Sequence, residues 1–209
     1  MAILGRMHRD GSQSRGRVGR RAKVAAFAQR SVLMLLASLC VVMTFAPVAK
    51  AQRAADVNKL KAAFIYQFSN FVDWPSEAFE LDDSPFVIGV VGNKDLREIL
   101  KSAVRGKSVD GHPLEIKSFE SSGDPSSCHI LFIGKTEKQH VQGILDLCSD
   151  KPVLTIGDSE DFTDKGGVIL LYEERNKLRI EINTDAADRA ELSISSRLLG
   201  LGRLVRDTD

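Results

Sequence analysis

The stretch Phe86-Val-Ile-Gly-Val-Val-Gly-Asn-Lys-Asp-Leu-Arg-Glu-Ile-Leu100 decides the fold class of this chain. Its first six residues form a continuous apolar run, which is typical of a strand buried on both faces. From Asp95 onward the apolar residues recur at helical spacing, which predicts a helix over 95–104. Gly92 and Asn93 are then turn residues between the two elements. A buried strand that leads directly into a helix is the repeating unit of a parallel α/β sheet.

The same alternation of strand and helix continues along the chain. Further strands are predicted over 114–119, 129–133, 153–156, 168–172 and 178–183, and further helices over 57–72, 136–148 and from about 186 or 192 to 205. Glu174 to Lys177 connects the last two strands as a hairpin. We therefore predict an α/β fold with a mostly parallel sheet flanked by helices, a C-terminal antiparallel hairpin and a closing helix.

The helix predicted over 57–72 is apolar on more than one side. Leu60, Phe64, Phe68 and Phe71 define one face, and Asp56 is the candidate N-cap. Because apolar residues also occupy the opposite side, the helix is expected to be buried on two sides or to present a surface to a partner.

Residues 1–51 have the features of a secretory signal peptide. A basic segment precedes an apolar run over 32–45, and Ala49-Lys-Ala51 matches the small-residue cleavage pattern. The run is shorter than the roughly 20 apolar residues that a membrane-spanning helix needs, although an uncleaved anchor is the alternative. The sequence predicts cleavage between Ala51 and Gln52, export to an oxidising compartment, and one mature domain over 52–209.

Charge divides the chain in the same way. Residues 1–51 carry nine of the 29 basic residues and one of the 28 acidic residues, which leaves 20 and 27 for residues 52–209, a net charge of −7. Nucleic-acid sites need clustered Lys and Arg, so the mature chain is not expected to bind nucleic acid.

Asn93-Lys94-Asp95 invites comparison with the guanine-reading motif of GTPases, but it is one residue short. A phosphate loop would require a glycine at Lys101 to accompany Gly106-Lys107-Ser108, so that motif fails too. Nucleotide hydrolysis is therefore excluded.

The sequence supplies no other assembled catalytic or metal-binding motif. Three histidines remain in the mature chain, at 112, 129 and 140, without the spacing of a metal site. Asp158, Glu160 and Asp161 follow a strand at its carboxyl end, where open α/β sheets bind ligands, although charges in such loops are usually solvated. We predict no catalytic residues, no metal and no cofactor.

Two cysteines, Cys128 and Cys148, remain after removal of the signal peptide. The first precedes a predicted strand and the second ends the helix that follows. The strand rises ~17 Å and the helix returns ~18 Å, so the two cysteines are brought to one level. The sequence favours a disulfide between them, with two buried thiols as the alternative.

In its order of segments the chain resembles the YfiR-like family of periplasmic regulators. The segments that carry the resemblance are Lys61–Pro75, Phe86–Gly92, Cys128–Gly134, Val153–Asp158, Gly166–Leu171, Arg179–Asn183 and Ser193–Val205. Together they extend over most of the mature chain, and the first helix with its Trp74-Pro75 is the most specific of them. A second disulfide found in some relatives has no cysteines here.

The resemblance implies a regulator without enzymatic activity. Its best-known relative binds an inner-membrane diguanylate cyclase from the periplasm and holds it inactive, and its release raises cyclic di-GMP and favours biofilm growth. Other members are expected to serve other membrane sensor proteins. Members can dimerise, so the resemblance also allows a homodimer of this chain. Two hypotheses follow for this chain: a repressor of a membrane cyclase through protein contacts, or a periplasmic small-ligand receptor that acts as a sensor subunit.

Overall fold

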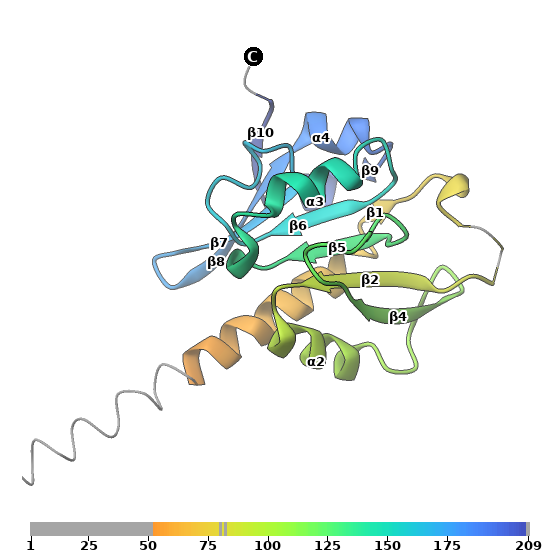
Figure 1. The fold of residues 1–209 in the computed structure, drawn as a ribbon, viewed down its shortest axis with the longest axis horizontal. Helices are drawn as coiled ribbons and strands as arrows, with labels where there is room; N and C mark the ends of the chain where they lie inside the picture. Colours follow the sequence, from red (N-terminus) through yellow and green to blue (C-terminus); the bar gives the residue numbers. More distant parts are fainter. Residues whose placement is uncertain (1–51, 80, 82, 208–209) are drawn as a thin grey trace, which may run out of the picture. The chain divides into compact units, whose positions relative to one another are not determined.

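An eight-stranded mixed sheet in the order β10-β8-β7-β6-β5-β2-β4-β3 organises the chain (Figure 1). The computed structural model describes residues 52–79, 81 and 83–207, and residues 53–209 group as one compact unit. The strands of this sheet are β2 (Phe86–Val91), β3 (Ser108–Val109), β4 (His112–Ser118), β5 (Ile130–Ile133), β6 (Leu154–Gly157), β7 (Ile169–Glu174), β8 (Lys177–Asn183) and β10 (Arg203–Val205). The expected α/β class is confirmed.

The central strands β4, β2, β5, β6 and β7 are parallel, and β8 returns antiparallel to β7 as the hairpin predicted from the sequence. Every residue of β2, β5 and β6 is buried, as expected for strands covered on both faces. Alternate residues of β5 separate the two faces. Ile130 and Phe132 join one apolar cluster, whereas Leu131 and Ile133 join the other.

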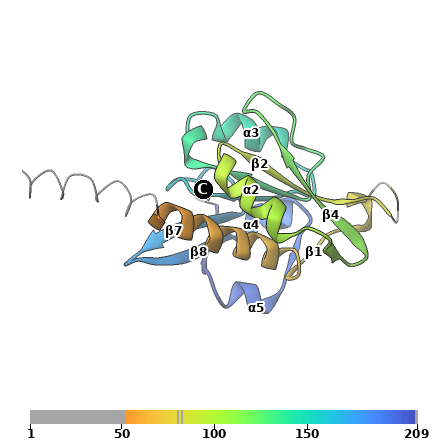
Figure 2. The same cartoon turned by 90° about the horizontal axis from the view of Figure 1, so that it is seen from below.

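Helices cover both faces of the sheet (Figures 1 and 2). They are α2 (Lys94–Ala103), α3 (Val141–Leu147), α4 (Thr184–Arg189), α5 (Ser196–Leu199) and an N-terminal helix over residues 52–68; short 3-10 turns are η1 (Ser76–Ala78) and η2 (Lys135–Glu137). The N-terminal helix, α2 and α5 contribute to the first cluster, and α3 contributes to the second. The apolar stripes of these helices therefore complete the two layers of the core.

The N-terminal helix differs from the expectation in its bounds and in its buried face. It is already helical at Gln52 and ends at residue 68, so Asp56 is not its N-cap. Leu60, expected on the buried face, is 45% exposed, whereas Ile65 and Phe68 are fully buried. A helix that is apolar on two stripes does not reveal from periodicity which stripe faces the sheet.

The segment after residue 68 becomes extended because β1 (Val72–Asp73) pairs with β9 (Ser193–Ile194) in a separate two-stranded sheet. This pairing lies outside the reach of local sequence patterns, since its partners are more than a hundred residues apart. The small sheet ties the end of the N-terminal helix to the C-terminal part of the chain.

The C-terminal region forms α4, β9, α5 and β10 in place of one closing helix. Asn183 caps α4 by accepting a hydrogen bond from the Ala186 N–H, and Glu191 takes a positive φ of 54° beyond its end. Ser195 caps α5 in the same way, through the Leu198 N–H. The caps at Asn183 and Ser195 and the left-handed residue Glu191 thus interrupt the segment that the spacing of apolar residues predicted as one helix.

The helix start expected at Thr136 is also displaced. Thr136 lies in η2, and its hydroxyl donates to the Gly92 carbonyl oxygen at 2.6 Å instead of capping α3. His140 is the N-cap residue of α3 and makes no side-chain cap bond. The hydroxyl therefore joins two loops at the carboxyl edge of the sheet.

Candidate functional site

The carboxyl ends of the central parallel strands bring several loops together. Val91 pairs with Ile133, and Ile133 pairs with Gly157, so β2, β5 and β6 end at one level. A Cβ added at Gly134 would lie 2.8 Å from the Gly92 oxygen, which shows how closely the first two loops approach. This edge is where open α/β sheets bind ligands, so it is the natural place to look for a site.

A cleft of about 550 Å³ lies at this edge. Its walls come from the N-terminal helix, η2, the loop after β6, and β7. The lining residues are Lys61, Lys135, Lys138, Asp158, Ser159, Glu160, Leu171, Tyr172 and Glu173. The cleft thus combines charged side chains with an apolar wall, as small-molecule sites do.

Asp158 lines the cleft, and both of its carboxylate oxygens accept hydrogen bonds. Oδ2 lies 2.5 Å from Lys61 Nζ, and Oδ1 accepts from the Lys135 backbone N–H. The side chains of Lys61 and Asp158 are only 9% and 5% exposed. Buried charges need such partners, and the pair fixes the N-terminal helix against the loops after β5 and β6.

Ser159, directly after Asp158, is 4% exposed. Its Oγ is the buried side-chain polar atom that lacks a hydrogen-bond partner within the part of the chain that the structure describes. Because buried hydroxyls are nearly always bonded, a water molecule or a ligand would supply the missing partner of this oxygen.

The rim of the cleft is charged and open to solvent. Lys138 and Lys165 both pair with Asp161 at 3.2 Å, and their hydrogen bonds hold the pKa of this carboxyl below its ordinary value. Glu173 pairs with Arg53 at 3.2 Å. Of the three acidic residues singled out from the sequence, Asp158 and Glu160 line the cleft, and Asp161 lies beside it.

The turn interpretation of the opening motif is confirmed. Asn93 caps α2 by accepting from the Leu96 N–H at 3.0 Å, and its amide donates to Asn58 of the N-terminal helix. Gly92 has a φ of 71°, a left-handed conformation that suits glycine.

His129 is buried, and both of its ring nitrogens are hydrogen-bonded. Nδ1 accepts from the Val87 N–H at 3.0 Å, and Nε2 donates to the Ala78 carbonyl oxygen at 3.1 Å. Burial lowers its pKa to about 4, so the ring is neutral at neutral pH. No group of three or more potential metal ligands occurs among the described residues.

The two cysteines lie on the same side of the sheet as α3, as buried free thiols. Cys128 is 4% exposed and Cys148 is 7% exposed. Burial raises the pKa of each thiol to about 12. The structure therefore shows the two cysteines as thiols without a bond between them. The disulfide stays a prediction for the protein in an oxidising compartment.

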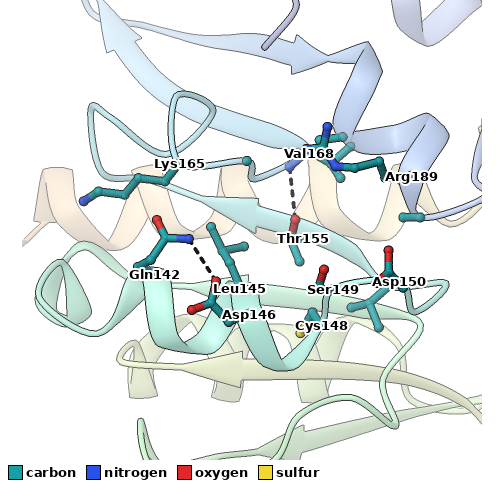
Figure 3. Close-up of a pocket in the computed structure, with 14 residues that line it drawn as sticks. Gln142, Leu145, Asp146, Cys148, Ser149, Asp150, Thr155, Lys165, Val168 and Arg189 are labelled. Atoms are coloured by element: carbon teal, nitrogen blue, oxygen red, sulfur yellow. Dashed lines mark hydrogen bonds between the residues drawn. The ribbon is translucent and has the colours of Figure 1, made fainter. Parts of the chain in front are cut away.

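A second pocket, of about 170 Å³, lies beside Cys148 between α3, β6 and α4 (Figure 3). The two basic residues that line it are already paired within the chain: Arg189 bonds Asp207, and Lys165 bonds Asp161. Gln142 likewise donates to Asp146 at 3.0 Å. These internal pairs leave the cleft at the carboxyl edge as the better candidate site.

Sequence reasoning singled out the loop at 158–161 but missed Lys61, Lys135 and Ser159. For Lys61 a signal existed, because it precedes Ile65 by four residues and Phe68 by seven, on the helix face that becomes buried. A lysine in line with buried apolar residues indicates an internal charge partner.

The predicted cleavage site between Ala51 and Gln52 lies at the limit of the described residues. Ala51 and the rest of residues 1–51 are outside them, and Gln52 is the first residue described and is already helical. Among the residues described, no helix combines the length and apolar character needed to cross a membrane.

Comparison with known proteins identifies the family. The family described as YfiR/HmsC-like matches residues 58–203 of this chain. The match extends over most of the sequence, so the protein belongs to the YfiR/HmsC-like family. No curated protein matches the chain.

Two solved structures share part of the arrangement. A conserved domain protein from Vibrio cholerae is 14% identical, with a TM-score of 0.44 over 57% of this chain and 54% of its own. An ABC domain from Streptococcus pneumoniae, solved in complex with L-Trp, is 9% identical, with a TM-score of 0.43 over 57% and 55%. The chain spans about half the length of the structures it matches.

Proposed function

We propose that this protein is a periplasmic regulator that represses an inner-membrane signalling partner, a diguanylate cyclase, through direct protein contact. The observation that carries the proposal is the match to the YfiR/HmsC-like family over residues 58–203. The best-known member of that family acts on such a cyclase, and members act as regulators rather than enzymes.

The proposed location depends on residues 1–51. Their basic segment, apolar run and Ala49-Lys-Ala51 pattern support export and cleavage before Gln52. N-terminal sequencing of the protein from a periplasmic extract tests this. A first residue at or near Gln52 is expected, and a membrane-bound chain that retains residues 31–51 would exclude the proposal.

Deletion of the gene tests repression. In a strain that expresses the partner cyclase, the deletion is expected to raise cyclic di-GMP and surface attachment. The full chain should restore the parent level, whereas a chain that lacks residues 1–51 should not, because it cannot reach the periplasm. Dinucleotide levels that the deletion leaves unchanged would contradict repression.

Direct contact requires a separate measurement. A tagged full chain, recovered from detergent-solubilised membranes after mild cross-linking, should bring a diguanylate cyclase with it, identified by mass spectrometry of the captured proteins. A tagged periplasmic protein of similar size and charge is the control. Recovery of a different membrane sensor would retain regulation by contact but would refute the cyclase as the partner.

A further inference from the structure

We propose that the cleft at the carboxyl edge of the sheet binds a small organic anion, whose carboxylate or phosphate group lies among Lys61, Lys135 and Ser159. An apolar or ring portion of the ligand would lie against Tyr172. The proposal rests on the cleft itself and is independent of which membrane protein the chain regulates.

The floor of the cleft has hydrogen-bond donors in excess. The Lys61 ammonium carries three N–H donors, and Asp158 Oδ2 is the side-chain acceptor that it bonds. The second Asp158 oxygen is already used by the Lys135 backbone N–H. A ligand with several acceptor oxygens matches the donors that remain on a buried ammonium.

Ser159 adds an independent observation. It lines the cleft, is 4% exposed, and its hydroxyl has no partner among the described residues. The oxygen itself has almost no exposed surface, so rotation of the side chain about its Cα–Cβ bond would bring it to the cleft. A hydroxyl donates one hydrogen bond and accepts others, so it complements a carboxylate or phosphate oxygen. A buried hydroxyl without a hydrogen-bond partner, next to a buried ammonium, lowers the stability of the protein when no ligand is bound. A ligand that bonds both groups would remove this cost.

The balance of charge favours an anion over a cation. Asp158 is bonded at both oxygens, and Glu173 pairs with Arg53. Glu160 and Lys135 are both exposed, so their opposite charges offset each other at the rim. The preference for an anion therefore comes from Lys61, whose buried ammonium keeps hydrogen-bond donors that Asp158 does not use.

Size and shape indicate an organic molecule rather than a bare ion. The cleft holds about 550 Å³, within the range of roughly 300–1,000 Å³ that is typical of small-molecule sites. Tyr172 on β7 is half-buried and packs against the second apolar cluster, so its ring supplies the apolar surface of the cleft, whereas Leu171 belongs to the first cluster, on the other face of the sheet. An anionic group at the lysines and a ring on Tyr172 would use both parts of the cleft.

Four small molecules test separately whether the ligand needs an anionic group and whether it needs a ring. Benzoate and phenyl phosphate carry both a ring and an anionic group, inorganic phosphate lacks the ring, and benzyl alcohol lacks the charge. Calorimetric titration of the mature protein at constant ionic strength should give millimolar or tighter binding for at least one anionic ring compound, and weaker binding for the other two probes. The bound compound should also raise the melting temperature.

Variants then locate the site. Ser159→Ala and Lys135→Gln should each weaken binding about tenfold, the change expected when a hydrogen bond to a charged group is lost. Lys101→Gln, an exposed lysine on α2, removes the same charge elsewhere and should leave affinity unchanged. Ser159→Ala removes an unbonded hydroxyl and should not destabilise the fold, so its effect on binding is separable from folding.

The proposal is overturned if no anionic ring compound binds at millimolar concentration. It is also overturned if benzyl alcohol or inorganic phosphate binds as well as these compounds, or if Ser159→Ala and Lys135→Gln bind like the parent. Binding that is weakened equally by Lys101→Gln would indicate general charge attraction and would refute a site in the cleft.

Discussion

The Nζ of Lys61 lies 2.5 Å from Oδ2 of Asp158, and this buried ion pair joins the N-terminal helix to the loop that follows β6. Removal of one member leaves the other charge buried without compensation, whereas joint replacement removes both charges. The pair therefore predicts a strongly non-additive response to mutation.

Lys61→Met is expected to lower the free energy of unfolding by about 3–5 kcal/mol, the cost of an unpaired buried charge. Addition of Asp158→Asn should recover a large part of this loss. Lys59→Met is the matched control, because Lys59 is exposed and its ion pair with Asp56 lies at the surface. Urea unfolding of the mature protein measures all three variants, and equal effects of the two lysine substitutions would refute a structural role for the pair.

His129 predicts a specific loss of stability in mild acid. Burial is the main cause that lowers its pKa from 6.5 to about 4, with nearby His112 and Lys117 acting in the same direction. Between these two pH values the unfolded chain binds a proton that the folded chain does not. Stability is therefore complete above pH 6.5 and falls as the pH decreases toward about 4, by at most about 1.4 kcal/mol per pH unit.

His129→Gln tests this contribution. An amide can still accept from the Val87 N–H and donate to the Ala78 oxygen, but it does not titrate. We expect the variant to lose less stability than the parent between neutral pH and pH 4 in chemical unfolding. Parallel pH profiles of the two proteins would show that the ring does not titrate as proposed.

Phe162 lies between two glycines, and this contact predicts a coupled pair of substitutions. A Cβ at Gly157 would lie 2.2 Å from Phe162, and one at Gly167 would lie 2.1 Å from it. Gly157→Ala is therefore expected to destabilise the protein by about 1–3 kcal/mol through overpacking. In a Phe162→Ala background the same change should cost much less, because the clashing ring is gone.

Gly143→Ala is the control for the glycine prediction. Gly143 lies inside α3, and an added Cβ there meets nothing within 4 Å. Alanine at an open helical position should stabilise the protein by up to about 1 kcal/mol. A Gly157→Ala variant as stable as Gly143→Ala in urea unfolding would show that Phe162 does not fill the space above Gly157.

Local pattern was sufficient to predict the fold class, the central strands and the mostly parallel sheet with its C-terminal hairpin. The continuous apolar run at Phe86–Val91 and the alternation in Lys177–Asn183 correspond to β2 and β8. These signals are strong because a strand buried on both faces is apolar throughout, whereas a strand buried on one face alternates apolar and polar residues. The class of fold follows from the order of such segments alone.

Long-range contacts account for what the sequence did not predict. The pairing of β1 with β9 and of β10 with β8 replaced helical ends with strands. The unpaired oxygen of Ser159 could not be foreseen, since it depends on packing and not on residue type. Gly89 could be interpreted in part from the sequence. A glycine inside a strand indicates that another group lies close to the backbone there, but only the structure shows that this group is the sulfur of Cys128.

The last prediction concerns Cys128 and Cys148, which we expect to form a disulfide in the exported protein. Both are buried on the α3 side of the sheet, one just before β5 and the other at the end of α3. As free thiols with pKa values of about 12 they would be unreactive in the folded protein. The bridge would therefore form before these residues become buried during folding.

A bridge that closes a loop of about 20 residues should contribute roughly 3 kcal/mol to stability. A reductant should accordingly lower the melting temperature of the parent but not of the Cys128→Ala, Cys148→Ala double variant, which has no bridge to lose. Mass spectrometry of the unreduced periplasmic protein measures the bond directly through the loss of two hydrogens. Two alkylatable thiols in the denatured, unreduced protein, together with melting that the reductant does not change, would show that the cysteines act only as small buried residues beneath α3.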